Sequence, residues 1–237
     1  MELDEFYRQV EQSEGRSISV PALIRKVYTW MALALAITGI TAYGVATNPH
    51  FIELVFGSRL TFYGLIGAEL ALVLILSARI NKLSLLTGTL MFIAYSVLNG
   101  ITMSAIFLAY TASSIASTFF ICAGTFGVMS AYGLLTKTDL SSVGKMLYMA
   151  LFGLIIATVV NIFLHSPMVS YITSYVGVVI FVGLTAWDTQ KIKLMLADAD
   201  YMDEGAQKLA LLGALTLYLD FVNLFLYLLR IFGGKKD

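Results

Sequence analysis

Seven runs of predominantly apolar residues, each about twenty residues long, divide this chain of 237 residues. They fall at about 28–47, 60–78, 84–109, 114–135, 146–165, 169–189 and 209–230. A helix of about twenty apolar residues crosses a hydrocarbon layer of about 30 Å, since each residue adds about 1.5 Å. The bilayer interior offers no water to unpaired backbone groups, so such spans must be helical. The pattern predicts an all-α membrane protein with seven transmembrane helices.

The composition agrees with a chain embedded in a membrane. Hydrophobic residues make up 59% of the chain and charged residues only 13%, whereas a soluble domain carries about 25% charged residues. Acids and bases balance at 15 each, so the chain has no basic field for nucleic acid. The single cysteine, Cys122, cannot form an intrachain disulfide or a cysteine metal site, and we expect it to be a packing residue.

One domain is expected, with a short cytoplasmic segment at 1–27, a seven-helix transmembrane domain at 28–232 and a polar tail at 233–237. The first residues are acidic, the reverse of the basic start of a signal peptide, so the first helix is predicted to be an uncleaved anchor. That helix should begin near Ser19 and Pro21, because serine caps helices and proline suits a first turn.

Two further stretches carry structural predictions. Small residues in the fourth run should permit close helix packing; they are Ala116, Ser117, Ala123, Gly124, Gly127 and Ser130. The polar connection at about 190–208 lacks the ligand order of a calcium-binding loop. We therefore expect it to be a solvated surface loop.

The basic residues predict the orientation of the chain. With the N-terminus in the cytoplasm, Arg59, Arg230, Lys235 and Lys236 lie outside, which leaves eleven of the 15 lysines and arginines inside (15 − 4). This excess fits the positive-inside rule. A seventh segment that re-enters the membrane would bring Lys235 and Lys236 inside, but its length favours a full span.

Two aspartates occur in or beside stretches that otherwise resemble membrane helix. Asp220 lies inside the seventh run, and Asp188 closes the sixth. An ionised carboxylate in the bilayer interior costs about 2.5–3.5 kcal/mol on insertion scales. Such residues persist when they pair, face water, or carry ions or protons, so this pair is the strongest functional signal in the chain.

The spacing of four charged residues predicts two ion pairs. Glu69 and Arg79 are ten residues apart (69 to 79), and so are Asp220 and Arg230 (220 to 230). Each interval is about 15 Å of helix. If the second and seventh helices lie antiparallel, Glu69 comes level with Arg230 while Arg79 comes level with Asp220. The two helices are therefore predicted to be neighbours that are bridged in this register.

Asp188 can reach the same layer, which would give two carboxylates beside one guanidinium. Two close carboxylates titrate as a coupled unit. Acidification would then protonate the pair, weaken its hold on Arg79 and let the second helix move. The alternative is a permanently paired network that only orders the bundle.

Two motifs in these segments resemble the Bax inhibitor-1 family, also called the transmembrane Bax inhibitor motif family, and in particular its bacterial branch. They are Gly183–Lys193 (GLTAWDTQKIK) and Gly213–Arg230 (GALTLYLDFVNLFLYLLR). Asn99–Thr111 (NGITMSAIFLAYT) and the stretch 116–145 support the match. The resemblance covers nearly the whole chain from the first helix onward.

This resemblance implies a seven-helix fold whose last helix is central and wrapped by the other six. It also implies a pH-sensitive calcium leak across the bilayer of the bacterial cytoplasmic (inner) membrane. The paired aspartates of the family correspond to Asp188 and Asp220, which would form the proton-sensing gate. Its second-helix arginine and acid match Arg79 and Glu69, and its arginine at the end of the seventh helix matches Arg230. Bacterial members are also linked to a membrane-bound quality-control protease, a candidate partner.

Calcium takes six to eight oxygen ligands, of which Asp188, Asp220 and Asn223 offer a part. A weak, transient metal site suits conduction, because an ion must leave as well as enter. Asn223 could equally be an interhelical hydrogen-bond residue, and Asn99 and Asn161 are expected to join helices rather than line a pore. No cofactor is implied beyond calcium as the permeant ion and protons as regulator.

Enzymatic functions find little support in the sequence. The two histidines, His50 and His165, fall at the predicted external ends of helices, and no Gly-x-Ser-x-Gly or His-Glu-x-x-His pattern occurs. The sequence contexts of intramembrane aspartyl proteases are also missing. We expect a non-enzymatic protein. Two alternatives to a channel stay open: a proton-coupled cation transporter, and a non-conducting modulator of another membrane complex.

Overall fold

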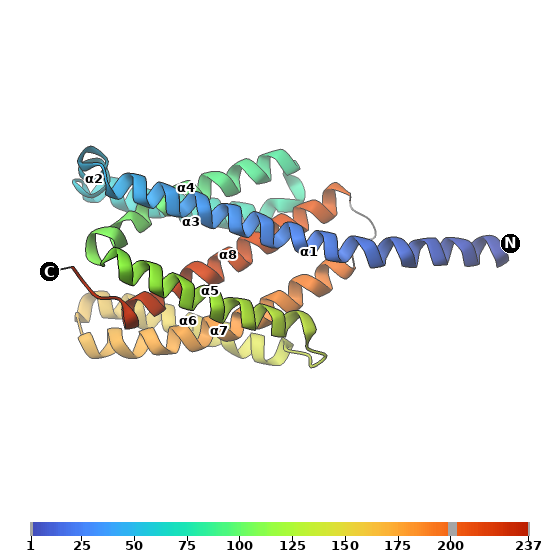
Figure 1. Ribbon diagram of the computed structural model, residues 1–237. Helices are drawn as coiled ribbons and strands as arrows, with labels where there is room; N and C mark the ends of the chain where they lie inside the picture. Colours follow the sequence, from blue (N-terminus) through green and yellow to red (C-terminus); the bar gives the residue numbers. More distant parts are fainter. Residues whose placement is uncertain (1, 199–202, 237) are drawn as a thin grey trace. The chain divides into compact units, whose positions relative to one another are not determined.

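The computed structural model describes residues 2–198 and 203–236, with side chains from residue 20 onward. Its helices are α1 (Glu2–Ala46), α2 (Pro49–Phe56), α3 (Arg59–Arg79), the 3-10 helix η1 (Ile80–Lys82), α4 (Leu85–Ala109), α5 (Ala112–Leu135), α6 (Ser141–Leu164), α7 (Pro167–Ala197) and α8 (Glu204–Phe232) (Figure 1). Within these residues, seven helices are long and apolar enough to cross a membrane. The predicted all-α class with seven spans is confirmed.

Helix α8 is the most buried of the seven spans. In its apolar window 67% of the residues are buried, against 6–39% in the other six. Helices α3 and α6 are the least buried, at 6% each, as expected for spans that face lipid. The expectation of a central seventh transmembrane helix is confirmed by this burial.

Short polar turns set the helix ends. Ser58 precedes α3 and its hydroxyl accepts a hydrogen bond from the Thr61 N–H (3.5 Å), while Thr111 serves α5 in the same way through Ser114 (3.3 Å). These side chains satisfy amide groups that have no partner inside the helix. Helix α6 ends at His165, which is in the left-handed region (φ 50°).

The start of the first helix differs from the prediction. Helix α1 begins at Glu2 and contains Pro21 in its interior, so Ser19 is not its cap. Proline removes one backbone hydrogen bond, and the helical turns on both sides carry the helix past it. The apolar span itself begins at Val20. Helix α2 was not predicted, although Asn48 caps it by accepting from the His50 N–H (3.0 Å) and Pro49 occupies its first position.

The predicted loop at 190–208 is wrong over most of its length. Helix α7 continues to Ala197, and α8 already begins at Glu204. In the added part of α7, Ile192 and Leu196 are buried while Lys191 is exposed. Apolar residues four apart form one face of an amphipathic helix, so a polar stretch can be helical without crossing the membrane. The aspartate at position 200, part of the expected loop, lies outside the described residues.

The chain divides into two compact units. The first comprises residues 1–102 and 192–215, and the second comprises residues 103–191 and 216–237. In the first unit, the Thr38 hydroxyl of α1 donates to the carbonyl of Ser96 on α4 (2.9 Å). A Cβ added to Gly100 would lie 2.7 Å from the carbonyl oxygen of Thr38, so glycine permits the close approach of these two helices.

In the second unit, α5 approaches α7 at Gly133. A Cβ there would overlap the carbonyl oxygen of Ala186. The small residues predicted to permit close packing behave differently from one another. Ser130 accepts a hydrogen bond from Thr189 of α7 (3.4 Å), as expected. The prediction is wrong for Gly124 and Gly127, because an added Cβ would have no described atom within 4 Å.

The polar tail after α8 is held against the turn between α4 and α5. The carbonyl of Gly234 accepts from the Thr111 N–H (3.1 Å), and the Lys236 N–H donates to the carbonyl of Ala109 (3.0 Å). At the other end of α8, Glu204 accepts from the Leu85 N–H at the start of α4 (3.0 Å).

Candidate functional site

The second unit brings Asp188 of α7 and Asp220 of α8 together. Their carboxyl groups are joined by a hydrogen bond. Their side chains are almost completely buried, with exposed fractions of 1% and 5%. Two carboxylates repel each other, so a hydrogen bond between them requires that one carries a proton. The geometry thus joins the two predicted residues, while their role as a gate stays a prediction.

Each of the two carboxyl groups keeps one oxygen outside this hydrogen bond. The Oδ2 atoms of Asp188 and Asp220 are buried and have no hydrogen-bond partner among the described residues. A buried polar atom without a partner costs about 1–3 kcal/mol. Most buried polar groups are satisfied, so an unsatisfied pair in one place is unusual. Both atoms are acceptors, which suits a proton donor or a cation.

Three further side chains surround the pair on α6 and α7. The ammonium group of Lys191 acts electrostatically on Asp188 and lies 5.1 Å from the centre of the Trp187 ring. Tyr148 packs edge-on against that ring (5.2 Å between centroids) and interacts electrostatically with both aspartates. The sequence reasoning missed Lys191 and Tyr148. The spacing of three residues from Asp188 to Lys191 was the available signal for the lysine.

Thr189 and Gln190, the two residues after Asp188, form hydrogen bonds from α7 to neighbouring elements. Gln190 accepts from the Leu140 N–H and donates to the carbonyl of Thr138, both at 2.9 Å, in the turn between α5 and α6. Asp139 in the same turn accepts from Ser141, and these hydrogen bonds hold the pKa of Asp139 below its ordinary value. The helix that carries Asp188 is thereby anchored on the side of this turn.

Phe221, the residue after Asp220, packs against aromatic side chains. Phe221 contacts Phe119 and Phe126 of α5 edge-on, with ring centroids 5.5 and 5.4 Å apart. Cys122 is buried, as predicted for a packing residue, and its sulfur lies 3.7 Å from the carbonyl oxygen of Phe221. These contacts exclude water from this side of α8, which strengthens every electrostatic interaction of the carboxyl pair.

Glu69 is half-buried on α3 and is joined to α4. It accepts hydrogen bonds from the Thr102 hydroxyl (2.8 Å) and from the Asn99 amide (3.4 Å). The prediction that Asn99 joins helices is confirmed. The same prediction for Asn161 is also confirmed, since its amide donates to Ser170 of α7 (2.7 Å). The sequence reasoning did not identify Thr102 as a partner of Glu69.

Arg79 and Arg230 are both exposed at the C-terminal ends of their helices. Arg230 lies over the ring of Tyr227, with 5.3 Å between the guanidinium carbon and the ring centre. The amide of Asn223 donates to the carbonyl of Leu219 on its own helix (2.8 Å). The predicted roles of these three residues, in charge pairing and in a pore, stay predictions.

The predicted pairing of Glu69 with Arg230 can be tested by exchanging their charges. Glu69→Arg alone should destabilise the protein, and the added Arg230→Glu should restore about 0.5–1.5 kcal/mol of that loss if the two residues face each other. Unfolding of both single variants and the double variant in detergent measures the coupling. If the double variant loses as much stability as the two single variants together, Glu69 and Arg230 do not pair.

The described residues contain no group of three or more histidine, cysteine, aspartate and glutamate side chains that could hold a metal ion. Asp188 and Asp220 therefore supply only part of the six to eight oxygens that calcium requires. Any cation at this pair would complete its shell with backbone carbonyls, amides or water. Such a site is weak.

The fold and the site define a class: a seven-span helical membrane protein with a buried pair of aspartates on its last two spans. The family described as "Inhibitor of apoptosis-promoting Bax1" matches residues 20–237. The chain is 48% identical to Inner membrane protein YbhL of Escherichia coli (strain K12) over 235 residues, which cover 99% of this chain and 100% of the relative. It is 46% identical to Uncharacterized protein RP147 of Rickettsia prowazekii over 214 residues, or 90% and 89% of the two chains. The chain belongs to the Bax inhibitor-1 family.

Proposed function

We propose that this protein is a pH-sensitive calcium leak channel of the bacterial inner membrane, with its N-terminus in the cytoplasm. Asp188 and Asp220 form the gate, and their protonation state sets its opening. The observation that carries the proposal is the hydrogen-bonded carboxyl pair, buried between two spans, in which one oxygen of each member has no hydrogen-bond partner among the described residues. Acids inside a membrane mark ion or proton pathways.

The gate works through the charge of the pair. In the proposed gate, a negatively charged carboxyl pair would attract the guanidinium of Arg79, and this attraction would keep α3 in place. Protonation at acidic pH removes the charge, weakens that hold and lets α3 move. The ammonium of Lys191, three residues from Asp188 on α7, is a positive charge that acts on the pair.

Calcium passes because its contacts are few and weak. The Oδ2 atoms of Asp188 and Asp220 bind the ion for a short time. Asn223 contributes its amide oxygen from the same helix as Asp220. A stronger site would trap the ion, whereas conduction requires easy entry and easy release.

Replacement of Arg79 tests the latch. Arg79→Ala should raise the calcium leak at neutral pH about tenfold, because about 1.4 kcal/mol of closed-state stabilisation is lost. Lys82→Ala removes a nearby exposed positive charge and serves as the control. The calcium flux of both variants is measured in liposomes. A flux through Arg79→Ala that equals the wild-type flux at every pH would show that Arg79 is not part of the gate.

The experiment that tests the function is calcium flux into proteoliposomes that contain only this protein. A channel leaks without a partner, and its rate should rise as the pH falls from about 8 to about 5. No flux above empty liposomes, with the protein shown to be folded, would overturn the channel and favour a modulator of another membrane complex, such as a quality-control protease. Flux that requires an opposing proton gradient would favour a proton-coupled transporter.

A further inference from the structure

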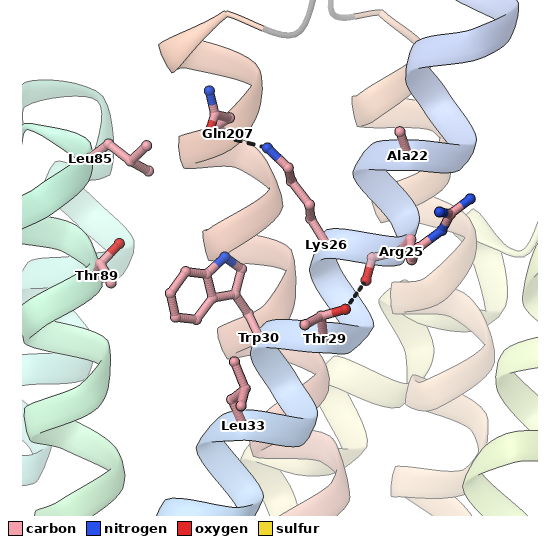
Figure 2. A pocket seen from close by; sticks show the side chains of 9 residues that line it. All are labelled: Ala22, Arg25, Lys26, Thr29, Trp30, Leu33, Leu85, Thr89 and Gln207. Carbon is pink, nitrogen blue, oxygen red and sulfur yellow. Dashed lines mark hydrogen bonds between the residues drawn. The ribbon is translucent and has the colours of Figure 1, made fainter.

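A cavity of about 470 Å³ lies in the first unit, between α1, α4 and α8 (Figure 2). Its size falls within the range of about 300–1,000 Å³ that is usual for ligand pockets. It belongs to a different unit from the aspartate pair, so the proposed gate makes no use of it.

The cavity lies where three apolar spans begin. Lys26 and Trp30 follow the start of the α1 span at Val20, Leu85 is the first residue of α4, and Gln207 is in the first turn of α8. The first turns of membrane spans lie at the level of the lipid headgroups. The predicted orientation puts these helix starts on the cytoplasmic side, where anionic lipids produce a negative surface potential.

The upper wall of the cavity carries a positive charge. Lys26 is half-buried, and its ammonium donates to the amide oxygen of Gln207 (3.2 Å). Among the described residues, the hydrogen-bond acceptor shown for Lys26 is thus a neutral group. An ammonium group has three N–H donors, so it can bind an anion while it keeps this contact. Arg25 also lines the cavity, but its guanidinium points away from Leu85 and Thr89 (Figure 2).

The lower wall is apolar. The indole of Trp30 points from α1 toward α4, with its nitrogen on the side of Lys26, and Leu33 lies beyond it (Figure 2). Leu33 is 48% exposed and leads toward the interior of the membrane span. Tryptophan is enriched at the boundary between headgroups and acyl chains, because its ring is apolar and its N–H is polar.

We propose that this cavity binds one anionic phospholipid. Its phosphate contacts the ammonium of Lys26 and the indole N–H of Trp30, and one acyl chain runs along Leu33. The order of the wall, positive charge first and apolar surface below, matches the order of the lipid from headgroup to chain. Basic pockets between spans on the cytoplasmic side are suited to such headgroups.

The test uses the fact that the chain has two tryptophans, Trp30 and Trp187. In Trp187→Phe, Trp30 is the sole tryptophan, and the quenching of its selectively excited fluorescence by brominated lipids reports which lipid lies against it. Brominated phosphatidylglycerol should bind about fivefold better than brominated phosphatidylcholine, since one lysine near the surface contributes about 1 kcal/mol. Lys26→Gln should reduce this preference to about one, whereas Lys26→Arg should keep it.

Two controls make the result specific. Lys82→Gln removes an exposed charge outside the cavity and should leave the preference unchanged. In Trp30→Phe, Trp187 should report no preference. Equal quenching by the two lipids, or a preference that survives Lys26→Gln, would overturn the proposal. Loss of the preference on addition of inorganic phosphate at constant ionic strength would assign the cavity to a soluble anion instead.

Discussion

Calcium flux through the variant with Asp188→Asn and Asp220→Asn is expected to be independent of pH between about 5 and 8. Asparagine has nearly the shape of aspartic acid and can still form a hydrogen bond, but it cannot ionise. The wild-type rate should change about tenfold over this range, which corresponds to about 1.4 kcal/mol in the equilibrium of the gate. The double variant should keep one rate throughout, close to that of the protonated wild type.

The measurement is the initial rate of calcium entry into liposomes at several pH values. Asp139→Asn is a matched control, because Asp139 is exposed in a turn of the same unit and its substitution changes the same chemical group. This control should titrate as the wild type does. A double variant whose flux still follows pH would show that the proton sensor lies elsewhere, even if the protein conducts.

Gly133→Ala should destabilise the protein by about 2–4 kcal/mol. The methyl group would overlap the main-chain oxygen of Ala186, and a backbone atom cannot rotate away as the end of a flexible side chain can. Inserting a group into a packed interface typically costs about 1–3 kcal/mol, and more when backbone must shift. The approach of α5 to α7 beside Asp188 would be lost with it.

Gly124→Ala is the matched control on the same helix. An added Cβ at Gly124 has no described atom within 4 Å, so the substitution should be neutral or stabilise the protein by up to about 1 kcal/mol through helix propensity. Thermal unfolding of both variants in detergent compares them directly. Equal effects of the two substitutions would contradict the packing of α5 against α7 at Gly133.

These two glycines also show what the sequence could and could not predict. The number of spans follows from the length of the apolar runs, and the aspartate pair stands out because acids are rare inside membranes. Which face of α5 packs against protein is not encoded in the same way. Lipid tails are as apolar as a protein interior, so a glycine that faces lipid looks like a glycine at a helix contact.

The surroundings of the pair were predictable only in part. Spacing along one helix could have indicated Lys191, whereas Tyr148 comes from another helix at a distance of 40 residues (148 to 188) and gives no local signal. The polar extension of α7 was taken for a loop because it leads into a stretch where aspartates and Glu204 occur among lysines. Burial of Ile192 and Leu196 keeps it helical. Contacts between residues far apart in the sequence determine both the position of Tyr148 beside the pair and the helical extension of α7.

The burial of α8 has a consequence for biosynthesis. Helix α8 follows the six other spans along the chain, so it leaves the ribosome after them, yet it is the most buried. While the earlier spans enter the membrane, Asp188 has no Asp220 to share a proton with. The nascent bundle must therefore tolerate a lone acid on α7 until its last span is inserted. The carboxyl pair is thus a late product of assembly, completed only when the translated segment Glu204–Phe232 reaches its place.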